Sequence, residues 1–202
     1  MRGAFVRVTD SALTPERILV TAEDVLRRYG PAKATVVDVA RALDVSHGAV
    51  YRHFPTKAAL REAVTERWLA RISGPLSEIA EEEGPAVERL RRWLELLISS
   101  KRSRALEDPE LFATYMELVA ESRDVVLAHV HILTGQIAAI IADGVVRGEF
   151  TRTDPEVAAR AVFDATARFH NPAHASEWSD PEIDAAFEGV WSLVTAALAS
   201  DG

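Results

Sequence analysis

The sequence contains no cysteine among its 202 residues, which excludes disulfide bonds, thiolate zinc sites and cysteine nucleophiles. It also lacks any run of eighteen consecutive apolar residues, so it predicts no membrane-spanning helix. The first ten residues, MRGAFVRVTD, have neither the apolar segment nor the small-residue cleavage site of a secretory signal. These absences favour a cytoplasmic protein that does not associate with a membrane.

Several patterns typical of enzymes and of β-sheets are missing as well. There is no Gly-rich phosphate loop, no G-x-S-x-G nucleophile elbow and no H-E-x-x-H run. No segment alternates apolar and polar residues for long, whereas apolar residues recur at spacings of three and four throughout the chain. The sequence therefore predicts an all-α protein of about nine helices.

Acidic residues outnumber basic ones, and the excess is unevenly distributed. The whole chain has 31 Asp and Glu against 23 Lys and Arg, for a net charge of −8. Residues 1–60 hold nine basic and six acidic residues (+3), so residues 61–202 hold fourteen and twenty-five (−11). Because screening confines each charge to about 8–10 Å, a basic head can approach DNA phosphates despite an acidic body. We therefore divide the chain into residues 1–60 and residues 61–202.

Four helix starts share one pattern, a capping residue followed by Pro and Glu. The capping oxygen accepts from free N–H groups, Pro needs no hydrogen bond there, and Glu faces the positive end of the helix dipole. The pattern occurs at Thr14-Pro15-Glu16, Asp108-Pro109-Glu110, Asp154-Pro155-Glu156 and Asp180-Pro181-Glu182. The expected helices span about 15–29, 36–43, 47–53, 57–72, 85–99, 109–121, 123–147, 155–170 and 181–199. Residues 101–104 are expected to form an exposed loop.

The segment 35–60, TVVDVARALDVSHGAVYRHFPTKAAL, predicts two short helices joined by a tight turn. Thr35 can cap the first helix, Asp44-Val45 forms the turn, and Ser46 caps the second helix. In the second helix Val50 faces the core, whereas His47, Gly48, Ala49, Tyr51 and His53 are expected to face outward. Such a pair, with a polar and aromatic outer face on the second helix, is typical of helix-turn-helix DNA-binding domains.

This segment resembles the signature of the TetR family of transcriptional regulators. The resemblance extends over roughly residues 14–65. The resemblance implies a three-helix DNA-binding head, a helical ligand-binding and dimerisation body, and no enzymatic activity or required cofactor. It further implies a repressor that binds a palindromic operator in double-stranded DNA as a homodimer and is released by a small-molecule effector. Asp44 departs from the family pattern, which usually has Gly here, but Asp tolerates the left-handed conformation better than most residues.

Side-chain chemistry assigns two kinds of DNA contact to the head. Contacts with phosphates are expected from Thr35, Tyr51, His53 and Lys57. Lys57 also begins a helix whose free N–H groups can bind an anion. Contacts with base edges are expected from residues at the start of the second helix: Ser46, His47, Gly48 and Ala49.

The resemblance also places a dimer interface and an effector pocket in the body. The interface is expected on helices 155–170 and 181–199, whose many alanines allow close packing. The pocket is expected among helices 85–99, 109–121, 123–147 and 155–170. Its candidate lining residues, each of which can equally be an ordinary core residue, are Trp93, Leu97, Phe112, Tyr115, Met116, Val119, Leu133, Phe163 and Ala167.

Four of the six histidines lie in the body, close to two carboxylates in the expected arrangement. A divalent metal site can be drawn from Glu117, His129, Asp164, His170 and His174. Alternatively, His170 and His174 satisfy a helix C-terminus. Two other functions stay open at this point: a metal-sensing regulator of the same family, and a metal-dependent hydrolase that uses His170, His174 and Asp164.

Overall fold

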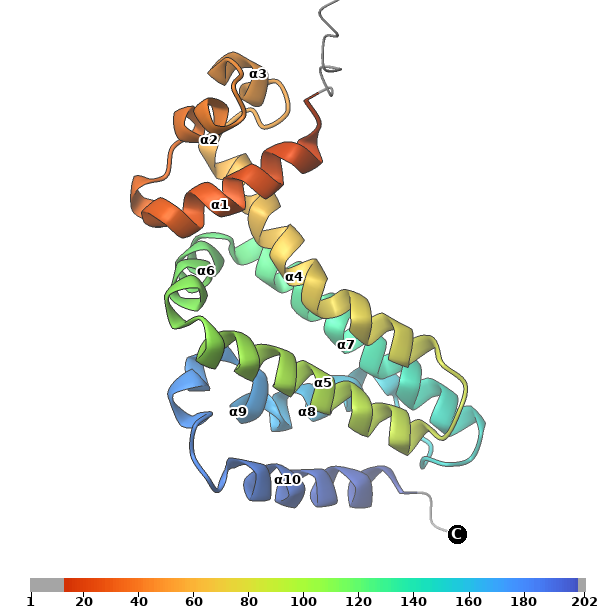
Figure 1. Cartoon of the computed structure of the whole chain (residues 1–202). Coiled ribbons are helices and arrows are strands. Elements are labelled where there is room, and N and C mark those ends of the chain that lie inside the picture. Colours follow the sequence, from red (N-terminus) through yellow and green to blue (C-terminus); the bar gives the residue numbers. More distant parts are fainter. Residues whose placement is uncertain (1–12, 200–202) are drawn as a thin grey trace, which may run out of the picture. The chain divides into compact units, whose positions relative to one another are not determined.

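The computed structural model describes residues 13–199 and divides into two compact units, one ending at Val64 and the other beginning at Thr65. Within the described residues there are ten α-helices and one 3-10 helix, with no β-strand and one isolated antiparallel bridge between Phe150 and Ala199 (Figure 1). The all-α prediction is confirmed.

The first unit, the head, is built from three helices and the start of a fourth. These are α1 (Pro15–Lys33), α2 (Val36–Ala42), α3 (His47–Tyr51) and the first residues of α4 (Lys57–Glu81). Gly30, at a φ of 73°, interrupts the helical conformation of α1 where the sequence predicts its end. The core of the head consists of small and branched apolar side chains: Ile18, Ala22, Leu26, Val39, Val50, Leu60 and Val64.

The second unit, the body, contains the rest of α4 and all later helices. They are α5 (Ala86–Glu107), α6 (Pro109–Glu121), α7 (Arg123–Val146), α8 (Pro155–Ala165), α9 (Ala167–His170), the 3-10 helix η1 (Pro172–Glu177) and α10 (Ile183–Leu198). Helix α7 packs against α5, α6 and α8 (Figure 1). Fully buried side chains from these helices, such as Leu90, Trp93, Leu133, Ile137 and Phe169, form the core of the body.

Three of the four Pro-Glu helix starts lie where the sequence predicts them. The side chains of Thr14, Asp108 and Asp154 each accept hydrogen bonds from free N–H groups of α1, α6 and α8. At the fourth, Asp180 accepts from the N–H of Glu182 at 2.9 Å, but the helix begins at Ile183. The capping residue there holds a turn that precedes the helix.

Helix α4 is longer than the sequence predicts. It was expected to stop before Ser73-Gly74-Pro75, but it continues to Glu81. Proline removes one helical hydrogen bond and crowds the preceding turn. This cost is offset because Ile72, Ser73 and Leu76 are buried, and because the Gln136 amide donates to the Ser73 carbonyl at 3.1 Å.

Two further boundaries differ from the prediction. Residues 101–104, expected to be an exposed loop, belong to α5, and Lys101 is buried. The helix expected over 155–170 is divided at Thr166, whose hydroxyl donates to the Val162 carbonyl at 2.8 Å. In the first case the run of charged residues was misleading, because one cation of the run faces inward.

Helix α7 has the length and composition of a membrane-spanning helix, with a mean hydropathy of 1.9 over an 18-residue window. Polar residues interrupt its sequence, so it contains no unbroken apolar run of eighteen residues. Its buried residues include Leu133, Ile137 and Ile141, and it packs against three other helices of the body. A helix at the centre of a helical core needs the same composition, so this feature alone is weak evidence for a membrane span.

Candidate nucleic-acid interface and ligand cavity

The start of α2 is fixed by a reciprocal capping box between Thr35 and Asp38. The Asp38 N–H donates to the Thr35 hydroxyl at 3.2 Å, and the Thr35 N–H donates to the Asp38 carboxylate at 3.1 Å. The hydrogen bond from the Thr35 hydroxyl lowers the pKa of Asp38. Thr35 is thus held at the surface of the head, with its hydroxyl proton donated to Asp38 at 2.6 Å.

The turn between α2 and α3 depends on a left-handed residue. Asp44 has a φ of 54° and is the one non-glycine residue with positive φ in the part of the chain that the structure describes. The Val45 N–H then donates to the Ala40 carbonyl at 3.0 Å, which closes the turn. The expectation that Asp44 adopts this conformation in place of Gly is confirmed.

Helix α3 presents a polar and aromatic outer face, as expected, with one exception. Ser46 caps it by accepting from the Ala49 N–H at 3.2 Å, and Val50 is fully buried. His47 and Gly48 are exposed, and Tyr51 is 40% exposed, with its ring edge-on to His47 at 6.4 Å between centroids. Ala49 was expected to point outward, but it is 8% exposed because its methyl group packs inside the head.

Exposed polar and basic side chains follow α3 along the chain. His53 and Lys57 are exposed, and the Thr56 hydroxyl caps α4 by accepting from the Ala59 N–H at 2.9 Å. Thr35 and Lys57 line the same small depression on the head, which brings together two predicted phosphate contacts from separate helices. Arg52, the exposed C-cap of α3, is a further cation that the sequence analysis did not select. Its position at the end of the outward-facing helix is the signal that could have identified it.

The body contains a cavity of about 280 Å³, partly open to solvent and lined by residues from α4 to α9. Five of the nine predicted lining residues surround it: Met116, Val119, Leu133, Phe163 and Ala167. Trp68 and Leu69 from α4, and Asn171 after α9, line it without having been predicted. The cavity therefore lies among the expected helices and also involves α4.

The other four predicted residues lie outside the cavity wall. Trp93 and Leu97 are fully buried in the core, where the Trp93 indole N–H donates to the Gln136 side chain at 3.0 Å. Tyr115 stacks on Trp68 at 4.5 Å between ring centroids, and Phe112 lies edge-on to the Trp178 ring at 6.3 Å. Trp68 lines the cavity, and Tyr115 packs against Trp68 without lining the cavity itself.

Polar side chains occupy one part of the cavity wall. His170 is buried, and its Nε2 lies 3.2 Å from the Phe163 carbonyl and 3.3 Å from the Thr166 hydroxyl. His129 is also buried, and its Nε2 has no hydrogen-bond partner. Asp164 accepts from Arg160 at 2.8 Å at the same wall. Burial, and secondly the charge of Lys101, lower the pKa of both histidines to about 4, so both rings are neutral near pH 7.

Lys101 is the cavity residue that the sequence analysis placed incorrectly. Its side chain lines the cavity from α5 and is 8% exposed. Burial, and secondly the charge of Arg104, lower its pKa from 10.5 to about 8. No carboxylate among residues 13–199 acts on the Lys101 charge. The helical spacing of Ile98 and Lys101, both buried, is the signal that could have placed it inside.

The residues of the predicted metal site are not brought together. Glu117 is exposed, and the His174 ring bonds to Glu177 at 2.8 Å, away from the cavity that His129, Asp164 and His170 line. Within the described part of the chain, no group of three or more His, Cys, Asp or Glu residues could hold a metal ion. The metal-site prediction, and the ligand set it offered to a hydrolase, are therefore not supported. The His170 ring instead lies against the Phe163 carbonyl in the last turn of α8. This contact resembles the alternative in which His170 satisfies a helix C-terminus.

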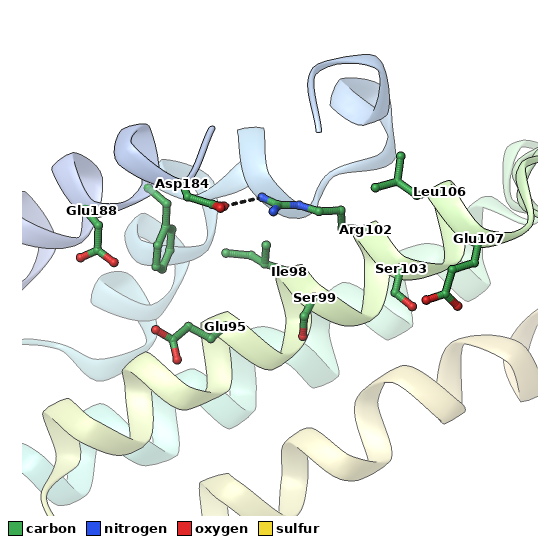
Figure 2. A pocket seen from close by; sticks show the side chains of 10 residues that line it. Glu95, Ile98, Ser99, Arg102, Ser103, Leu106, Glu107, Asp184 and Glu188 are labelled. Atoms are coloured by element: carbon green, nitrogen blue, oxygen red, sulfur yellow. Dashed lines mark hydrogen bonds and ion pairs between the residues drawn. The ribbon is translucent and has the colours of Figure 1, made fainter. Parts of the chain in front are cut away.

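A second hollow, of about 470 Å³, lies on the body surface between α5 and α10. Figure 2 shows Arg102 reaching from α5 to Asp184 of α10, and the two form an ion pair at 2.9 Å. Three further carboxylates line this groove: Glu95, Glu107 and Glu188. Because its cation is already paired and its rim is acidic and open, we assign no effector to it.

The outer faces of α8 and α10 form an apolar strip with small residues at its centre. Val157 is 66% and Leu193 is 72% exposed, unusually high for large apolar side chains. The groove between the two helices, about 550 Å³, is lined almost entirely by apolar residues: Val157, Ala158, Ala161, Val162, Ala165, Val190, Leu193, Val194, Ala197 and Leu198, with Thr153. A contiguous exposed apolar surface of this kind marks an interaction site.

Both units match models of known protein families. Residues 18–64 match the model described as "Bacterial regulatory proteins, tetR family". Residues 86–191, just over half of the chain, match "Tetracyclin repressor-like, C-terminal domain". The two matches cover the head and most of the body.

Individual proteins are similar over a part or the whole of the chain. Nucleoid occlusion factor SlmA from Vibrio atlanticus is 36% identical over 78 residues, which are 38% of this chain and 40% of that protein. The structure of SmeT, repressor of a Stenotrophomonas maltophilia multidrug efflux pump, superposes with a TM-score of 0.66 at 22% identity, covering 94% of this chain and 92% of that one. The regulator FadR from Bacillus subtilis, solved with stearoyl-CoA, gives a TM-score of 0.58 at 19% identity, covering 92% and 100%. At these identities the structural likeness shows a shared fold.

Proposed function

The chain belongs to the TetR family of bacterial regulatory proteins, and we propose that it represses transcription as a homodimer that binds a palindromic operator and releases it when a small molecule occupies the body cavity. The regulator acts on double-stranded DNA in the cytoplasm and needs no cofactor. The observation that carries this proposal is the outer face of α3. Ser46 caps this helix, and the exposed polar side chains of His47 and Tyr51 form no hydrogen bond with other described residues of the head.

The chemistry of α3 and its surroundings supports DNA as the partner. His47 and Ser46 supply hydrogen-bonding groups at the start of the helix, where a recognition helix meets base edges. Gly48 allows close approach because it adds no side chain to this face. Arg52, His53 and Lys57 follow on the chain and are exposed, as phosphate contacts require.

The apolar strip on α8 and α10 supports a homodimer. A twofold symmetric dimer would bury this strip against the same strip of a second copy, as in a four-helix interface. The alanines predicted to allow close packing, Ala161, Ala165 and Ala197, lie within the groove. Two heads related by twofold symmetry read a sequence with the same symmetry, which is why the operator is a palindrome.

The body cavity supports release by a small molecule. Trp68 and Leu69 in its wall belong to α4, the helix whose first residues contribute to the head. A ligand that packs against them better in the released conformation shifts the equilibrium away from DNA. Coupling of about 1–3 kcal/mol corresponds to a 5- to 150-fold loss of operator affinity. SmeT has been solved with triclosan and FadR with stearoyl-CoA, so proteins of this fold do hold small molecules.

Selection of DNA from a random duplex library tests this proposal. Purified protein should enrich an inverted repeat with two equal half-sites, roughly one helical turn or a small multiple apart. His47→Ala should change the preferred bases at one or two positions in each half-site and keep the spacing between them. Enrichment of a single asymmetric site would contradict the dimer, and enrichment of no sequence would contradict the regulator itself.

A further inference from the structure

Lys101 is an unusual residue for the inside of a helical body. It is 8% exposed and lines the cavity, yet no carboxylate within residues 13–199 acts on its charge. Buried charges in proteins are normally paired, because removing an ion from water without a partner is costly. An anion bound beside Lys101 would therefore stabilise its charged form.

The groups around Lys101 do not meet this need from within the chain. The acidic residue in the cavity wall, Asp164, is already paired with Arg160 at 2.8 Å. The two histidines whose pKa values Lys101 lowers, His129 and His170, are neutral near pH 7, and Arg104 adds a second cation nearby. This end of the cavity is thus electropositive, although the body as a whole carries a large excess of acidic residues.

A second unsatisfied group lines the same cavity. His129 is 6% exposed, and its Nε2 has no hydrogen-bond partner. His170, in contrast, is already held by the Phe163 carbonyl and the Thr166 hydroxyl, so it is not free to serve a ligand in the same way. A neutral imidazole can donate one hydrogen bond from Nε2, and an anionic oxygen is the strongest acceptor for it.

We propose that the effector of this protein is a small carboxylic acid, bound with its carboxylate between the Lys101 ammonium and the His129 ring and its apolar part against Leu133, Val119 and Phe163. This inference rests on the proposed effector function of the cavity and specifies the chemical class of the ligand. The carboxylate supplies the missing counter-ion and accepts from the His129 Nε2–H. Because the rest of the cavity wall is mainly apolar, the remainder of the ligand should be a hydrocarbon chain or ring.

The test is isothermal titration calorimetry with unbranched monocarboxylates of four to twelve carbons, each compared with its uncharged primary amide. Because no DNA is present, the measurement is independent of operator binding. At pH 7 the wild-type protein should bind at least one carboxylate at least about tenfold more tightly than the matching amide, since a charge-assisted hydrogen bond is stronger than a neutral one. If no acid in the series exceeds its amide, the proposal is overturned.

Variants locate the effect within the cavity. Lys101→Met keeps the length of the side chain, removes its charge, and should abolish the preference for the acid over the amide. His129→Leu should weaken binding of the acid, and an unchanged affinity would remove His129 from the site. Arg92→Met, on the exposed side of the same helix, removes an equal charge and should keep the full preference. A preference that survives Lys101→Met would place the anion site elsewhere.

Failure of this inference and failure of the proposed function give different results. A protein that binds its selected operator but no carboxylate remains a regulator with another class of effector. A protein that binds a carboxylate at Lys101 but no operator keeps this inference about the cavity and loses the regulatory role.

Discussion

At the scale of single residues, Lys101 is the position where stability and ligand binding conflict. A buried lysine without a counter-ion destabilises the folded protein, because burial penalises its charged form. The same penalty lowers the pKa of Lys101 from 10.5 to about 8. Arg104 and the neutral rings of His129 and His170 interact with Lys101. Arg160 and Asp164 line the same cavity as an ion pair, so none of these groups compensates the Lys101 charge. Such a residue is expected where a ligand, and not the fold, requires it.

The prediction is that Lys101→Met stabilises the ligand-free protein at pH 7 by about 3 kcal/mol, the free energy that corresponds to this pKa shift. In the wild type, the unfolded chain binds more protons than the folded protein between pH 8 and pH 10.5, so the Lys101 contribution to stability rises with pH across this window. Urea unfolding of both proteins at pH 7 and pH 10 measures the effect. The advantage of the variant should shrink at pH 10, and a less stable variant at pH 7 would show that Lys101 has a partner in the fold.

Among the helices, the close approach of α3 to DNA can be tested by a substitution that should not destabilise the head. A Cβ added at Gly48 would meet nothing closer than the Ser46 hydroxyl at 3.9 Å, an ordinary contact. Gly48→Ala should therefore leave stability unchanged or raise it by up to about 1 kcal/mol, because Ala favours a helix more than Gly does. Operator affinity should fall at least about tenfold if the backbone here approaches the bases closely, as measured by fluorescence anisotropy.

The matched control is Gly135→Ala, a partly exposed helical glycine in α7 whose added Cβ would meet nothing within 4 Å. It should gain helix propensity in the same way and bind the operator as the wild type does. Equal affinities for Gly48→Ala and Gly135→Ala would mean that α3 does not lie close to DNA at this position.

The start of α4 provides a separate test of phosphate binding. Lys57 is exposed, and we assign it to a phosphate, so Lys57→Ala should weaken binding of specific and unrelated duplexes by similar factors. The slope of log K against log salt should fall by about one unit, since one fewer counter-ion is released. A change in which sequence is preferred would instead assign Lys57 to a base edge.

Several helix starts could be predicted from the sequence, whereas two of the helix ends could not. Caps at Thr14, Thr35 and Ser46 are local, so their positions were predictable from neighbouring residues alone. The continuation of α4 past Pro75 and of α5 past Lys101 depends on burial by other helices, which local signals do not contain. For the same reason the sequence analysis found the α3 face but placed Lys101, the most informative residue of the cavity, in a loop.

For the whole molecule, the proposed dimer would form through the exposed apolar strip on α8 and α10. Trp191 is buried within its own body, where Arg91 lies over its ring at 5.8 Å, so a substitution there would damage the fold itself. Leu193 is 72% exposed, and Leu193→Asp should leave the body folded. In a dimer it would place two unpaired carboxylates in an apolar interface and weaken association on the order of 100-fold or more.

Sedimentation velocity over a range of concentrations measures this effect. Val146→Asp is the control, because Val146 is 85% exposed and lies outside the α8 and α10 strip. We expect the Leu193 variant to be a folded monomer with reduced operator affinity, and the Val146 variant to be a dimer. A Leu193→Asp protein that remains a dimer would move the interface away from this strip.

Recognition of a particular DNA sequence by the proposed regulator is measured by one affinity ratio. Fluorescence anisotropy at a single near-physiological salt concentration should compare the selected inverted repeat with a scrambled duplex of equal length and base composition. We predict that the repeat binds at least about 1,000-fold more tightly, since specific regulators exceed their non-specific binding by this factor or more. Equal affinities for the two duplexes would contradict it, because the exposed face of α3 would then contribute charge without sequence recognition.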